Sequence, residues 1–74
     1  MVVTIKLFAQ YRRGRFKEAA RELPPGTMCH EVLADLGLDP PGVGILLVNG
    51  RHANLDHALS DQDTVSVFPL VGGG

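Results

Sequence analysis

The residues of this sequence with the clearest chemical potential are the last three, Gly72, Gly73 and Gly74. A glycine run that ends a chain leaves its carboxylate without neighbouring side chains, so the end fits a narrow channel and adopts backbone angles that other residues avoid. The preceding segment, residues 65–69, alternates and then stops at a proline, which indicates a strand followed by a tail. We therefore expect residues 70–74 to form a flexible tail that carries the carboxylate of Gly74 into the active site of another protein. A frayed terminus without a function is the plainer alternative.

The other reactive side chains favour structural roles. Cys29 shares an apolar helical stripe with Val32, which indicates core packing rather than a nucleophile. Asp61 and Asp63 flank Gln62 and are typical of a turn. The histidines have neither cysteine partners nor the spacing of metal ligands, so we expect no metal site. They are His30, His52 and His57. We expect no catalytic residue and no bound cofactor in this chain.

Length and composition describe one small domain. The sequence has 74 residues, is 45% hydrophobic and carries a net charge of −1. It is too short to hold a nucleotide site, a catalytic cleft and a substrate pocket of its own. No run of about 18 apolar residues exists, so we expect no membrane span. The first residues begin as a strand without the layout of a signal peptide, and the single cysteine excludes an internal disulfide, so we expect a cytoplasmic protein.

Charge is unevenly distributed along the chain. Residues 1–21 hold six basic side chains and one acidic one, whereas residues 22–74 hold one basic and seven acidic ones. Such asymmetry can attract positively or negatively charged partners. Two charged faces that are simply exposed to water explain it equally well. The basic loop Arg12-Arg13-Gly14-Arg15 beside Tyr11 is thin support for nucleic-acid binding, and we do not expect a nucleic-acid partner.

Hydrophobic periodicity predicts five strands and one helix. The strands are expected over residues 2–8, 16–23, 45–48, 51–53 and 64–68, and the helix over residues 28–36. Thr27 or its neighbour is expected to cap the helix and Gly37 to end it. The apolar strand 45–48 is expected to be covered on both faces. Asn49-Gly50 predicts a hairpin, and in the irregular stretch 54–60 Leu55 and Leu59 are expected to enter the core.

The resulting order, β-β-α-β-β-β, is the α+β arrangement called β-grasp, with one helix across a mixed sheet as in ubiquitin-like domains. We expect this domain to span residues 1–69, with the first and last strands parallel at the centre. Val3, Ile5, Leu7, Val65 and Val67 would then face the helix. Phe8 and Phe68 would share the opposite face near the tail, as an exposed aromatic pair that a partner protein could cover.

Several short motifs, in this order and spacing, resemble the MoaD/ThiS family of ubiquitin-like sulfur carrier proteins over nearly the whole chain. They are Leu-Phe-Ala-Gln-Tyr-Arg (7–12), Leu-Pro-Pro-Gly-Thr (23–27), Val-Asn-Gly (48–50), Leu-Ser-Asp-Gln-Asp-Thr-Val (59–65) and the tail Phe-Pro-Leu-Val-Gly-Gly-Gly (68–74). The first motif is closer to MoaD, the small subunit of molybdopterin synthase, than to ThiS of thiamine synthesis. Leu70 stands where a MoaD-like tail usually has a second proline, and Gln62 where the turn usually has glycine.

The resemblance implies a carrier rather than an enzyme. Gly74 would be adenylated with ATP by an E1-like enzyme and converted to a thiocarboxylate. Leu70, Val71, Gly72 and Gly73 would thread into the partner's active site. The sulfur would pass to a synthase subunit, MoaE-like for molybdopterin or thiazole-synthase-like for thiamine. Two alternatives stay open: a non-covalent ubiquitin-like binding module, and a modifier that tags other proteins through the same terminus.

Overall fold

Within residues 1–70, which the computed structural model describes, five strands form one mixed sheet in the order β2-β1-β5-β3-β4. The strands are β1 (Val2–Leu7), β2 (Glu18–Glu22), β3 (Val43–Val48), β4 (Arg51–His52) and β5 (Thr64–Pro69). The same residues also form one α-helix, α1 (Cys29–Asp35), and two short 3₁₀ helices, η1 (Ala9–Arg12) and η2 (Pro40–Gly42). The predicted β-grasp order is therefore confirmed.

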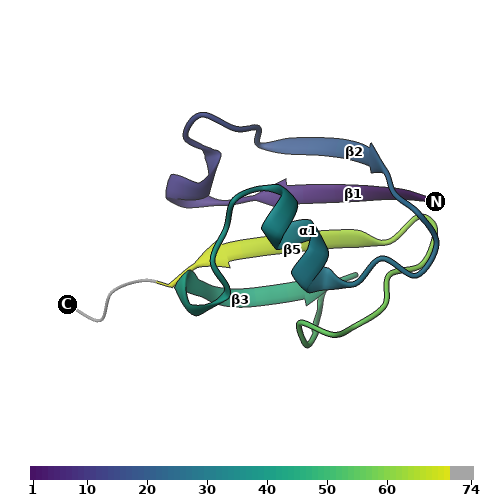
Figure 1. Ribbon diagram of the computed structural model, residues 1–74. Coiled ribbons are helices and arrows are strands. Elements are labelled where there is room, and N and C mark those ends of the chain that lie inside the picture. The colour runs from purple at the N-terminus through teal and green to yellow at the C-terminus, as the bar shows by residue number, and fades with distance from the viewer. Residues whose placement is uncertain (71–74) are drawn as a thin grey trace.

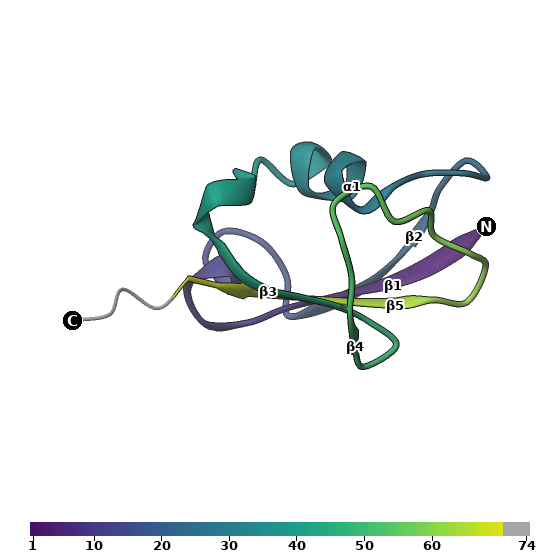
Figure 2. The ribbon, with the colours of Figure 1, turned by 90° about the horizontal axis from the view of Figure 1, so that it is seen from below.

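Strands β1 and β5 run parallel to each other at the centre of the sheet (Figure 1). In this pairing Ile5 lies opposite Val65 and Leu7 lies opposite Val67. All four side chains are buried, together with Val3. Helix α1 lies across one face of the sheet and leaves the other face open (Figure 2). The predicted core face of the two central strands is confirmed.

Helix α1 contributes Cys29, Val32 and Leu33 to the same core. The helix begins after Met28, whose backbone N–H donates to Oε1 of Glu31 at 3.0 Å. Thr27 does not cap the helix, because its hydroxyl donates to the carbonyl of Pro24 at 2.7 Å and closes the preceding turn. The residue at the N-cap of α1 is therefore Met28, the neighbour of Thr27.

Two residues predicted to be in the core are exposed. Ile45 is 42% exposed because only one face of β3 is covered: Leu46 and Val48, which alternate with it, are each 7% exposed. The prediction that both faces of this strand are covered is therefore wrong. Leu55 is 40% exposed, whereas Leu59 is buried as predicted.

The turns at the end of the sheet far from the tail depend on carboxylates. Asp61 accepts the backbone N–H of Val2 at 2.7 Å, and this hydrogen bond lowers the pKa of the carboxyl. Asp63 accepts the backbone N–H of Ser60 and the side-chain amide of Asn49, each at 2.8 Å. Both aspartates therefore have the structural role that the sequence predicts. Asn49 and Gly50 have φ values of 53° and 80°, as a tight hairpin turn requires.

Substitution of Cys29 tests whether this side chain is packed in the core. Its side chain is 0% exposed, and burial raises the pKa of the thiol, so the thiol remains protonated at neutral pH. Cys29→Ala should lower the free energy of unfolding by about 1 kcal/mol, the scale of a small buried deletion. Urea denaturation measures this loss. Rapid alkylation of native Cys29 by iodoacetamide at pH 7 would contradict the assignment.

Candidate functional site

An aromatic pair lies where the two central strands end. Phe8 directly follows β1 and Phe68 lies in β5, and their rings stack with centroids 4.1 Å apart and an interplanar angle of 9°. Both alternate with buried residues, Leu7 and Val67, so they lie on the face of the sheet that α1 leaves open. Each ring covers part of the other, and for this reason the two side chains are half-buried rather than exposed.

Arg12 fixes one member of this pair. Its guanidinium carbon lies 5.3 Å from the centroid of the Phe8 ring, within the range of a cation–π contact. Its Nε donates to the carbonyl of Leu7 at 2.7 Å. The arginine therefore joins the end of β1 to the Phe8 ring beside it.

Ile45 extends the aromatic pair across β3. In the antiparallel pairing of β3 with β5 it lies opposite Phe68, and Leu47 lies opposite Ser66 in the next row. We call Phe8, Phe68 and Ile45 the open-face patch. Apolar side chains clustered on an uncovered sheet face are typical of a protein contact surface. Sequence reasoning missed Ile45, because the wholly apolar run 45–48 does not show which of its faces is covered.

The predicted tail begins beside this patch. Leu70 is 59% exposed, and its backbone N–H donates to the carbonyl of Gly42 at 2.7 Å. The remaining residues predicted to thread into a partner or to be modified lie outside the described part of the chain. They are Val71, Gly72, Gly73 and Gly74.

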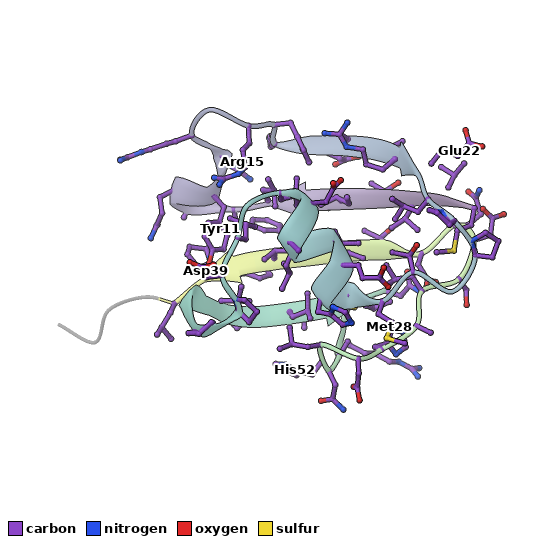
Figure 3. All side chains as sticks on the ribbon, in the orientation of Figure 1. Tyr11, Arg15, Glu22, Met28, Asp39 and His52 are labelled. Atoms are coloured by element: carbon purple, nitrogen blue, oxygen red, sulfur yellow. The ribbon has the colours of Figure 1, made fainter. Side chains whose placement is uncertain are left out.

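Tyr11 also reaches the base of the tail. Its hydroxyl donates to the same Gly42 carbonyl at 2.7 Å. Its pKa is raised mainly by burial of the ring and further by Asp39, while Arg15 opposes this shift. Figure 3 shows these three labelled residues gathered at the end of the sheet where β5 finishes. Sequence reasoning named Tyr11 in the motif of residues 7–12 and beside the basic loop, and gave it no role at the tail.

Within residues 1–70, the histidines and the basic loop are the remaining candidates. No group of three or more metal-ligating side chains comes together in this part of the chain. No helix there is long and apolar enough to cross a membrane. Two arginines of the basic loop donate to main-chain carbonyls, Arg12 to Leu7 and Arg15 to Leu36. These two side chains therefore have main-chain partners within the fold.

Comparison with known families decides the class. The model of the ThiS family matches residues 5–74, nearly the whole chain. The chain belongs to the ThiS family. No curated protein matches it by sequence. The predicted resemblance to MoaD/ThiS proteins is confirmed, and this member of the ThiS family is accordingly a small ubiquitin-like carrier rather than a catalyst.

Solved structures agree with this placement. A putative molybdopterin converting factor, subunit 1, from Pyrococcus furiosus is 30% identical, with 96% of this chain and 99% of that chain covered and a TM-score of 0.78. Subunit 1 in a complex of subunits 1 and 2 of the molybdopterin-converting factor from Helicobacter pylori is similar in fold, at 24% identity over 100% of both chains and a TM-score of 0.67. SAMP1 from Haloferax volcanii is likewise similar in fold, at 23% identity over 100% of both chains and a TM-score of 0.77.

Stability measurements distinguish the residues of the open-face patch from those of the core. Val67 is 0% exposed, so Val67→Ala leaves a buried cavity and should lower the free energy of unfolding by about 2 kcal/mol. Phe68→Ala and Phe8→Ala remove half-buried rings from the surface and should cost less. Thermal melts of the three variants give the comparison. A larger loss for Phe68→Ala than for Val67→Ala would place Phe68 in the core.

Proposed function

We propose that this ThiS-family protein is a sulfur carrier whose terminal Gly74 is adenylated and then converted to a thiocarboxylate. The sulfur is donated in cofactor biosynthesis, with a molybdopterin-type product as the first candidate. The observation that carries the proposal is the family match, which extends to Gly74 itself. The direction of β5 supports it, because the strand leads the chain past the open-face patch towards the tail.

The chemistry requires activation of a poor electrophile. The carboxylate oxygen of Gly74 attacks the α-phosphorus of ATP, so an acyl–phosphate bond forms and pyrophosphate leaves. Hydrosulfide from a sulfur donor then attacks the acyl carbon, so a carbon–sulfur bond forms and AMP leaves. The product is a thiocarboxylate with one sulfur in place of one oxygen, and no oxidant or reductant is consumed.

The partner supplies most of the catalysis. An E1-like adenylating enzyme binds ATP, aligns the carboxylate with the α-phosphate and excludes water. The carrier supplies a surface to grip and an end that fits a narrow channel. Glycines without a Cβ at positions 72–74 are suited to such a channel.

The acceptor of the sulfur is proposed to be the second subunit of a molybdopterin-type synthase. The relative from Pyrococcus furiosus is a putative subunit 1 of a molybdopterin converting factor, and the protein from Helicobacter pylori is seen with its subunit 2. A thiazole synthase is the second candidate, because the matching family model is that of ThiS. Binding of purified carrier to each type of subunit distinguishes these acceptors.

Mass measurement tests the modification. The chain is incubated with its adenylating enzyme, ATP and sodium sulfide. Because the enzyme holds the reactants in line, the reaction should proceed and the intact chain should gain about 16 Da, the mass difference between sulfur and oxygen. Deleting Gly74, or changing Gly73→Leu, should abolish the gain and leave the thermal melt unchanged. Cys29→Ala should be loaded normally. An unchanged mass with an enzyme shown to bind the carrier would refute the proposal.

Binding measurements test the docking surface. Phe8→Ala or Phe68→Ala should weaken binding to the acceptor subunit by more than about 1 kcal/mol, because aromatic anchors dominate many interfaces. Arg13→Ala is the matched control, since this exposed residue follows η1 without belonging to the patch. Titration calorimetry gives the affinities. Equal affinities for Phe68→Ala and the parent would show that the partner does not use this face.

A further inference from the structure

The base of the tail is attached to the start of β3. The backbone N–H of Leu70 donates to the carbonyl of Gly42 at 2.7 Å, and Pro69 pairs with Val43. One residue earlier in β5, Phe68 pairs with Ile45, so β3 holds one extra residue, Gly44, between two consecutive pairs. Such a bulge bends its strand and changes the direction of the chain beside it.

Tyr11 ties a third segment to the same point. Its hydroxyl donates to the Gly42 carbonyl at 2.7 Å from a position 31 residues away in sequence. That carbonyl therefore accepts two hydrogen bonds, one from the tail and one from η1, which matches the two lone pairs of a carbonyl oxygen. The backbone N–H of Tyr11 donates to the carbonyl of Phe8 at 3.2 Å, so the tyrosine is in turn positioned by the end of the open-face patch.

Gly44 is required for this close approach. A Cβ built on Gly44 would lie 2.8 Å from the carbonyl oxygen of Pro69 and 3.0 Å from Cα of Leu70. These atoms are backbone and cannot move aside without shifting the tail. The same construction at Gly42 meets only the Tyr11 hydroxyl, at 3.5 Å, which is an ordinary contact.

We propose that the Tyr11 hydroxyl, the Gly42 carbonyl and the bare backbone of Gly44 form a tail clamp, which fixes the direction in which the chain leaves the sheet at Leu70. Tyr11 and Gly44 are positioning residues: they do not contact the reacting carboxylate. By ordering the base of the tail before binding, they reduce the conformational entropy that is lost when the partner takes up residues beyond it. This role rests on the proposed function.

Tyr11→Phe tests the clamp with the least disturbance, because it removes one oxygen and keeps the ring. Amide hydrogen exchange followed by NMR should show faster exchange at Leu70 by about threefold to tenfold, the factor that one hydrogen bond is worth, while Val65 in the core is unchanged. Gly44→Ala should accelerate exchange at Leu70 further. Gly42→Ala, which keeps the carbonyl and has room for its Cβ, should leave exchange at Leu70 as in the parent.

Adenylation kinetics give the functional readout. With the adenylating enzyme and ATP, Tyr11→Phe should raise KM for the carrier by about threefold to tenfold and change kcat by less than about twofold, because the clamp acts before the chemical step. Arg13→Ala, in the exposed loop beside η1, should show the parent's kinetics.

Hydrogen exchange tests whether the clamp exists, and adenylation kinetics test whether it assists the reaction. Unchanged exchange at Leu70 in folded Tyr11→Phe, or acceleration equal to that at Val65, would overturn the clamp. Faster exchange at Leu70 with an unchanged KM would overturn its role in the reaction. If the parent protein itself is not adenylated, the proposed function fails together with that role, whereas the exchange measurement still decides whether the clamp exists.

Discussion

The parallel pairing of β1 with β5 is the constraint on which the rest of this structure depends. It places Ile5 opposite Val65 and Leu7 opposite Val67, so the two central strands direct their buried side chains to the same face. Helix α1 covers that face because its own apolar stripe needs a partner surface. A shift of one residue in this register would turn the buried side chains of one of the two strands to the open face. The pairing therefore determines the core and the open face together.

The same pairing connects the fold to the carrier role. The residues that follow the buried pairs are Phe8 and Phe68, and their stacking marks the point where β5 delivers the chain to the tail. Ile45 widens this surface, and the Gly42 carbonyl holds the tail beside it through Leu70. Under the proposed function, an adenylating partner would have to recognise a folded surface and take up the residues that follow Leu70 at the same time. In this protein the surface and the base of the chain end are neighbours, fixed by one sheet register.

Sequence reasoning predicted the order of elements, the central core face and the face of the sheet on which Phe8 and Phe68 lie, because alternation along isolated strands carries that information. It expected these two rings to be exposed, whereas they are half-buried. It misplaced Ile45, since a short apolar run does not show how many faces are covered. It also missed the contacts of Gly42 and Gly44 with the tail. These depend on a bulge and on close backbone approach between β3 and β5, and only the three-dimensional pairing reveals them. Gly44 lay just before the strand predicted over residues 45–48, whereas the observed strand begins at Val43.

The central claim is that the carboxylate of Gly74 is the group on which the partner acts. The most direct measurement is isotope exchange between pyrophosphate and ATP, because adenylate formation is the step that releases pyrophosphate and runs in reverse when labelled pyrophosphate is added. With the adenylating enzyme present, exchange should require this chain and should disappear when Gly74 is deleted. Exchange of the same rate without the chain, or with the chain lacking Gly74, would contradict the account.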